Sequence, residues 1–158
     1  MSAMPTLHAS AVLTGARAVL IRGPSGAGKS RLALALIAAA ETGALPFARL
    51  VADDRSRLAQ EHGRLLVRPA AELAGLIEVR GLGIRRLPFE PVAVVGLVVD
   101  LAAADGERLP TETSQRALLE GVQVARLAVA SGVDPLPLVL ALRMSNDAAA
   151  PAAVRFGR

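Results

Sequence analysis

The sequence predicts a single α/β domain. Short apolar runs rich in β-branched residues alternate with segments rich in Ala and Leu, which favour helix. A glycine-rich pattern joins the first clear strand to the first clear helix, as in phosphate-binding βα units. The length of 158 residues corresponds to one ordinary domain. We expect this domain to span residues 1–146, followed by a flexible, Ala-rich tail at 147–158.

The first half of the chain contains four predicted elements. Residues 18–22 (AVLIR) form a short apolar run that ends at a glycine, which predicts a buried strand. Residues 30–41 (SRLALALIAAAE) predict a helix that ends before Thr42-Gly43. Residues 49–52 (RLVA) predict a second buried strand, and residues 69–76 a short helix with proline in its first turn.

The second half predicts three strands and a final helix. Residues 76–80 (LIEVR) alternate between apolar and charged side chains and then stop at a Gly-Leu-Gly turn. Residues 91–101 form the most strand-like stretch of the chain, and residues 122–129 (VQVARLAV) alternate again. The apolar segment 136–144 predicts a terminal helix.

Composition excludes several classes of protein. A hydrophobic content of 53% excludes a disordered chain, and the lack of cysteine excludes disulfides and thiolate metal sites. The formal charge is +4, but the arginines are scattered and aromatic residues make up 2%, so we expect no nucleic-acid partner. No signal-peptide pattern and no apolar run of about 18 residues is present, so we expect a soluble, cytoplasmic protein without membrane contact.

The glycine-rich pattern matches G-x-x-x-x-G-K-[ST] without a departure. Its glycines allow the backbone to direct N–H groups at an anion, and the following helix N-terminus adds positive partial charge. Lys29, the only lysine of the chain, is expected to reach the β- and γ-phosphates of ATP, and the Ser30 hydroxyl to bind Mg²⁺. The predicted nucleotide-binding residues are Gly23, Pro24, Ser25, Gly26, Ala27, Gly28, Lys29 and Ser30.

Two successive carboxylates, Asp53 and Asp54, follow the predicted strand at 49–52. A phosphate-binding loop commonly works with an acidic residue at the end of a neighbouring strand, which organises the metal. Adjacent carboxylates repel each other unless a metal or a proton separates them, so they can take different roles. We expect Asp53 on the metal side and Asp54 as the general base facing an incoming hydroxyl, with Asp53 as the alternative base.

These stretches together resemble the catalytic domain of the HPr kinase/phosphorylase family. The matching segments are Leu7-His8, GPSGAGKS (23–30), RLVADD (49–54), IEVRGLGI (77–84) and Glu107-Arg108-Leu109. They occur in the family's order and cover about the first two-thirds of the chain, and IEVRGLGI is a signature of the family rather than of phosphate loops in general. Since relatives often carry an additional N-terminal domain, the chain resembles a short form with the catalytic domain alone.

The resemblance implies roles that the residues alone do not. It makes His8 an active-site residue, Glu78 a magnesium ligand and Arg108 a catalytic cation beside the transferring phosphoryl group. It implies a mainly β core like the nucleotide site of phosphoenolpyruvate carboxykinases, an HPr-type phosphocarrier as partner, and a hexamer. The expected function is therefore ATP-dependent phosphorylation of a serine on HPr, with Mg²⁺.

Removal of the phosphate by phosphorolysis, which releases pyrophosphate, is less well supported by the sequence. Relatives usually have a basic segment shortly before the last helix, whereas residues 130–134 read ASGVD and contain no cation. Two alternatives to the HPr kinase also stay open: a kinase of a small metabolite, and a nucleotide-dependent regulatory module that transfers no phosphate.

Overall fold

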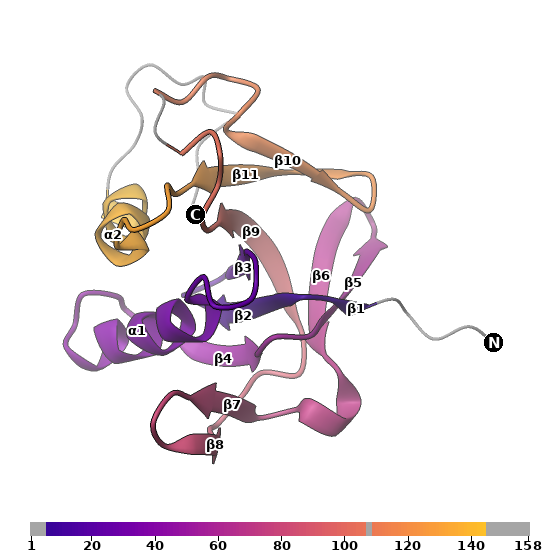
Figure 1. Cartoon of the computed structure of the whole chain (residues 1–158). Coiled ribbons are helices and arrows are strands. Elements are labelled where there is room, and N and C mark those ends of the chain that lie inside the picture. The colour runs from indigo at the N-terminus through magenta and orange to yellow at the C-terminus, as the bar shows by residue number, and fades with distance from the viewer. Residues whose placement is uncertain (1–5, 107–108, 145–158) are drawn as a thin grey trace.

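The computed structural model describes residues 6–106 and 109–144. They form a mixed α/β domain with a mainly β core, as predicted (Figure 1). The helices are α1 (Lys29–Glu41) and α2 (Pro135–Met144), together with the 3-10 helix η1 (Ala71–Leu73). The strands are β1 (Thr6–Leu7), β2 (Ala9–Leu13), β3 (Ala18–Arg22), β4 (Arg49–Ala52), β5 (Ser56–Glu61), β6 (Arg64–Pro69), β7 (Leu76–Val79), β8 (Gly83–Arg86), β9 (Ala93–Asp100), β10 (Arg116–Leu119) and β11 (Val122–Ala128).

The main sheet has the strand order β1-β5-β6-β9-β3-β2-β4. β9 lies parallel to β3 and antiparallel to β6, and its second half also pairs with the parallel strand β11, which forms a hairpin with β10. β2 lies antiparallel to β3 on one side and to β4 on the other. β3, β4 and β9 therefore run in the same direction, and the loops that follow their C-terminal ends lie at one edge of the sheet, where a site can be built.

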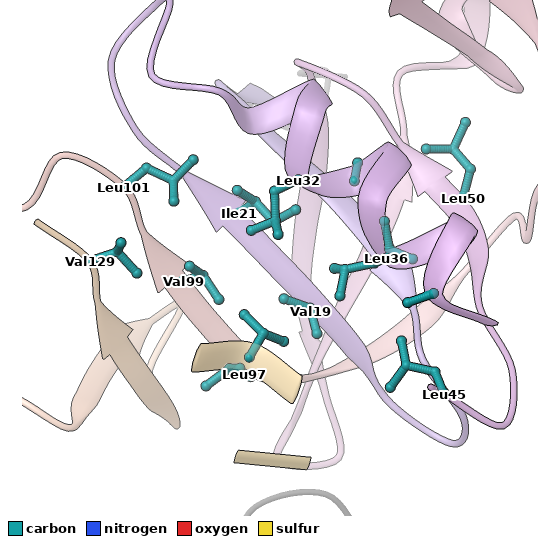
Figure 2. Close-up of a cluster of buried hydrophobic side chains, with 14 of the residues drawn as sticks. Val19, Ile21, Leu32, Leu36, Leu45, Leu50, Leu97, Val99, Leu101 and Val129 are labelled. Carbon is teal, nitrogen blue, oxygen red and sulfur yellow. The ribbon is translucent and has the colours of Figure 1, made fainter. Parts of the chain in front are cut away.

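The two faces of the sheet bury separate clusters of side chains. Val19 and Ile21 of β3 face α1 and α2, whereas Ala18 and Leu20 face the side of β5, β6 and β10 (Figures 1 and 2). This alternation is the period-2 pattern of a strand buried on both faces. At Gly96 the register of β9 shifts against β3. Val95 and Leu97 therefore lie on opposite faces of the sheet, and each joins the hydrophobic cluster of its own face.

Most predicted elements are present. The strands expected at 18–22 and 49–52 match β3 and β4, and those expected at 76–80, 91–101 and 122–129 correspond to β7, β9 and β11. The two longer helices begin one residue earlier than expected. His62 and Gly63 form the β5–β6 turn, and both have positive φ. The expected tail at 147–158 lies outside the described residues.

The helix expected at 69–76 is wrong. Only η1 forms there, and Pro69 is the last residue of β6, opposite Ser56 of β5. Ala70 and Ala74 on either side of η1 have extended backbones, with ψ of 133° and 130°. Proline is compatible with the end of a strand as well as with a helix start, and here the strand pairing decides. Within the described residues, no helix has the length and apolar character needed to cross a membrane.

Candidate active site

The glycine-rich loop, residues 23–30, connects β3 directly to α1. Gly26 and Gly28 have φ of 82° and 102°, in the left-handed region that favours glycine. Gly28 immediately precedes α1, and no side chain caps the start of this helix. The N–H groups of the first helical turn therefore remain available to an anion.

Lys29 lies against this loop. Its Nζ donates hydrogen bonds to the carbonyl oxygens of Gly23 at 2.9 Å and Pro24 at 3.3 Å, and the residue is 8% exposed. Gly23 is also packed closely, since a Cβ there would lie 3.0 Å from Leu101 Cβ. The one lysine side chain of the sequence is thus held at the loop whose amides are suited to phosphate.

Asp53 connects the glycine-rich loop to two other segments. Its Oδ1 accepts hydrogen bonds from Ser30 Oγ at 2.6 Å and from Ser10 Oγ at 2.8 Å. Its Oδ2 accepts one from the backbone N–H of Glu78 at 3.1 Å, and the residue is 7% exposed. These three hydrogen bonds orient the carboxylate. Because all three donors are neutral, they do not cancel its negative charge.

Asp54 has a different environment. Its side chain is 59% exposed, and its Oδ1 lies 3.9 Å from Nδ1 of the similarly exposed His8. Its φ of 65° is uncommon for a residue with a Cβ, and turns the chain away from β4 directly after Asp53. One carboxylate of the pair is therefore buried beside the loop, and the other faces outward beside a histidine.

Glu78 lies on β7, where only its backbone contacts Asp53, and its side chain is exposed. Within residues 6–106 and 109–144, no three His, Cys, Asp or Glu side chains gather to hold a metal ion by themselves. Mg²⁺ usually takes only one or two protein ligands and completes its shell with water and substrate phosphates. The donor set of Ser30, Asp53 and Glu78 suits that kind of binding and does not suit an all-protein metal cage.

Comparisons with known proteins identify the family of this chain. The family model described as HPr Serine kinase C-terminal domain matches residues 1–141. The chain belongs to this family. The structure of the Hpr(Ser) kinase/phosphatase from Coxiella burnetii matches with a TM-score of 0.68 and 27% sequence identity, over 86% of this chain and 91% of that chain. A search of the curated proteins found no significant match.

Four of the residues that the resemblance to HPr kinases singled out converge in the structure. The structure brings together His8, Asp53, Asp54 and the backbone of Glu78 where β2 begins and β4 ends, next to the glycine-rich loop. Arg108 lies outside the described residues. Ser10 was missed, because its contact depends on β2 lying between β3 and β4, which no local pattern reveals.

Sequence reasoning also missed a charged cluster on the other side of β3. Arg22 donates to both oxygens of Asp100 at 2.7 and 2.8 Å, and Arg126 Nε donates to the same carboxylate at 2.6 Å. The guanidinium of Arg126 also bonds both oxygens of Asp105, at 2.8 and 3.1 Å. Burial alone would raise the pKa of Asp100, but the bonds and charges of the two arginines outweigh it and hold that pKa below its ordinary value.

The segment 130–134, which contains no basic residue, lies near the glycine-rich loop. A Cβ on Gly106 would lie 2.3 Å from the backbone N of Ala130, so the loop after β9 packs tightly on this segment. The start of the same loop contacts Gly23 through Leu101. Asp134 accepts a hydrogen bond from Leu136 N at 3.1 Å and so caps the first turn of α2.

Proposed function

We propose that this chain is an ATP-dependent kinase that phosphorylates a serine of an HPr-type phosphocarrier protein. The observation that carries the proposal is the 2.6 Å hydrogen bond between Ser30 and Asp53, residues 23 positions apart. It joins the loop suited to phosphate with the acidic strand end, an arrangement expected of a Mg-nucleotide site. Membership of the HPr serine kinase family supplies the substrate class.

The proposed binding of ATP rests on the glycine-rich loop. Its backbone amides and the start of α1 would hold the phosphates, and Lys29 would exchange its two carbonyl contacts for phosphate oxygens. Ser30 would be a ligand of Mg²⁺, with Asp53 orienting the ion's shell and Glu78 approaching from β7. The ion would supply charge neutralisation on the phosphate oxygens.

The proposed transfer step uses Asp54 as the base. The serine Oγ of the partner attacks the γ-phosphorus of ATP, its proton passes to the Asp54 carboxylate, and the bond from the γ-phosphorus to the ADP oxygen breaks. The exposure of Asp54 is compatible with access for a protein hydroxyl, and His8 lies close enough to orient the carboxylate. Asp53 is the less suitable base, because three donors already occupy its oxygens in a buried position.

The proposal is tested by mixing purified protein, Mg²⁺, γ-labelled ATP and HPr. We expect label on a serine of HPr, and its loss with Lys29→Met while the unfolding temperature changes little, because Lys29 lies in the first turn of α1 and its Nζ bonds the glycine-rich loop rather than the core. Arg31→Met, on the exposed side of α1 next to the loop, serves as the matched control. Label on a small metabolite, or nucleotide binding without transfer, would favour one of the two alternative functions instead.

Phosphorolysis is proposed to be slow relative to the forward reaction. It requires phosphate and phosphoserine side by side, and their repulsion must be offset by cations. Residues 130–134 lie near the site without a cation, and Arg126 is already bound to two carboxylates. Serine-phosphorylated HPr with millimolar phosphate should release pyrophosphate well below the kinase rate. Rapid release would mean that cations from elsewhere, such as a neighbouring subunit of the expected hexamer, complete the site.

We also propose a hexamer, a cytoplasmic location and a likeness to the nucleotide site of phosphoenolpyruvate carboxykinases. The hexamer can be checked by light scattering of the purified protein, and the cytoplasmic location by fractionation of cells. The expected likeness to the nucleotide site of phosphoenolpyruvate carboxykinases can be checked with a nucleotide complex. The hexamer and the carboxykinase likeness are implied by the resemblance to the family, and the cytoplasmic location by the lack of a signal-peptide pattern in the sequence.

A further inference from the structure

Ser10 is a buried hydroxyl at the centre of the candidate site for which the proposed chemistry has no use. It lies on β2 with no exposed surface, opposite Ile21 of β3. β3 leads into the glycine-rich loop, and β4, on the other side of β2, ends immediately before Asp53. Ser10 therefore lies between the two segments that the proposed reaction must hold together.

The Ser10 hydroxyl makes one bond to each aspartate of the pair. It donates its only proton to Asp53 Oδ1 at 2.8 Å, and its oxygen accepts the backbone N–H of Asp54 at 3.1 Å. The directions are fixed, because an ionised carboxylate can only accept and an N–H can only donate. One side chain thus orients the carboxylate of Asp53 and the backbone of Asp54 together.

The backbone of Asp54 needs such support. Arg55 N donates to Asp53 O at 2.8 Å, which closes a three-residue turn around Asp54 with its φ of 65°. A three-residue turn with positive φ at its centre is the rarer and strained form. Such conformations persist where the surroundings over-determine them, and here Ala9 N holds Asp54 O while Ser10 holds Asp54 N.

We propose that Ser10 is a positioning residue of the phosphoryl-transfer site. Its hydroxyl keeps Asp53 directed at Ser30 and locks the strained turn that places the Asp54 carboxylate outward beside His8. The effect of this hydroxyl on phosphoryl transfer rests on the proposed kinase function, whereas the locking of the turn does not. Ser10 itself contacts neither nucleotide nor protein substrate in this scheme.

Ser56 provides a matched control for this proposal. It is also a serine without exposed surface, and its Oγ donates to Ala9 O at 2.8 Å, on the same strand as Ser10. Its hydroxyl binds a backbone carbonyl and neither of the two aspartates. Loss of the Ser56 hydroxyl should therefore destabilise the same region without releasing Asp53 or Asp54.

The first experiment measures phosphoryl transfer to HPr by Ser10→Ala, Ser10→Thr and Ser56→Ala. We expect kcat to fall about 10- to 100-fold in Ser10→Ala, because small displacements of reacting groups carry penalties of that size. KM for ATP should change less than about threefold, since the loop amides and Lys29 are untouched. Ser10→Thr keeps the hydroxyl and should recover most of kcat, and Ser56→Ala should stay within about threefold of wild type. Equal losses of kcat in Ser10→Ala and Ser56→Ala at equal stability would overturn the proposal.

The second experiment does not depend on activity. Amide hydrogen exchange, followed by NMR on the full chain, reports the Asp54 N–H directly. We expect its protection to fall at least tenfold in Ser10→Ala and to persist in Ser10→Thr and Ser56→Ala. Retained protection in a folded Ser10→Ala would overturn the proposal even if the kinase is active. Lost protection, together with no transfer to HPr by wild type, would leave the turn-locking role standing while refuting the proposed function.

Discussion

Two carboxylates, Asp53 and Asp100, lie at the ends of β4 and β9, and the groups that hydrogen-bond to them give them different properties. Asp53, after β4, is bound by two hydroxyls and one amide, all neutral. Asp100, at the end of β9 and opposite Arg22 in the sheet register, is bound by two guanidinium groups. A carboxylate oriented by neutral donors keeps its charge for a cation that arrives, whereas one paired with arginines has its charge already neutralised.

The difference shows that an acidic residue at a strand end is not sufficient evidence of a metal-binding role. Asp100 lies on the strand parallel to β3, a position from which an acidic residue could also serve a phosphate loop. What distinguishes the two is the charge of the groups that hold them. We therefore expect Asp53 and Asp54 to act on the reaction and Asp100 to act on stability.

The largest effect is expected for Asp54→Asn. The transfer rate to HPr should fall about 10²- to 10⁴-fold, because a positioned base contributes that much, while Mg-ATP affinity stays nearly unchanged. Asp53→Asn should instead weaken Mg-ATP binding, because it removes the anion beside Ser30. Rapid-quench kinetics and nucleotide titration separate the two results. The reverse pattern would exchange the roles of the pair and leave the site in place.

Asp100→Asn should reduce stability more than activity. It leaves Arg22 without its anion and Arg126 with Asp105 alone, at a position where the Asp100 side chain is 16% exposed, which we expect to cost about 3 kcal/mol. Urea unfolding measures this cost, and transfer assays well below the unfolding midpoint should show less than about a tenfold loss. A loss of activity comparable with that of Asp54→Asn would place Asp100 in the catalytic machinery and end the contrast.

The pH dependence of stability sharpens the same contrast. The pKa of Asp100 is lower in the folded protein than its ordinary value of 3.8, so the unfolded chain binds the proton more readily. The stability from this group is therefore fully present above about pH 5 and is lost as pH falls through 3.8 toward the folded pKa. The difference in unfolding free energy between wild type and Asp100→Asn should shrink over that interval. If this difference in unfolding free energy stayed constant as the pH falls, the pairing of Asp100 with the two arginines would not be its cause.

The smallest effect is expected for Glu78→Gln. The exposed carboxylate would approach Mg²⁺ only when Mg-ATP is bound, so its loss should raise the Mg²⁺ concentration at half-maximal rate by about fivefold. The maximal rate at saturating Mg²⁺ should change little. Glu61→Gln, also exposed but on β5, is the control. Superimposable Mg²⁺ titrations of wild type and Glu78→Gln would remove Glu78 from the metal site.

The predictable part of the fold is the part in which local preference and tertiary context agree. β3 and β4 are short apolar strands that end at glycine or aspartate, and α1 is rich in Ala and Leu. β2 (ASAVL) has few β-branched residues, yet it lies between β3 and β4 in the sheet with four of its five residues buried. Its place there results from pairing with β3 and β4, which overrides the weak strand preference of Ala and Ser.

The candidate site divides in the same way. The meeting of the glycine-rich loop with Asp53 could be predicted, because the chemistry of a phosphate loop requires an acidic strand end nearby. The contacts of Ser10 with Asp53 and of Arg22 with Asp100 could not be predicted. They join residues 43 and 78 positions apart, which only the strand order brings together. The β5–β6 hairpin was missed although His62-Gly63, both with positive φ, is a plausible two-residue turn, because Leu, Ala, Gln and Glu around it favour helix.

The cap on α2 constrains how this chain could change during evolution. Asp134 lies in the segment 130–134, which contains no cation, and its carboxylate holds the first turn of α2. A lysine there would add a cation near the glycine-rich loop but remove the cap, at a cost of about 1 kcal/mol. A variant lineage that gains efficient phosphorolysis would therefore more readily acquire its cation at Ser131 or Val133, both exposed, than at Asp134 itself.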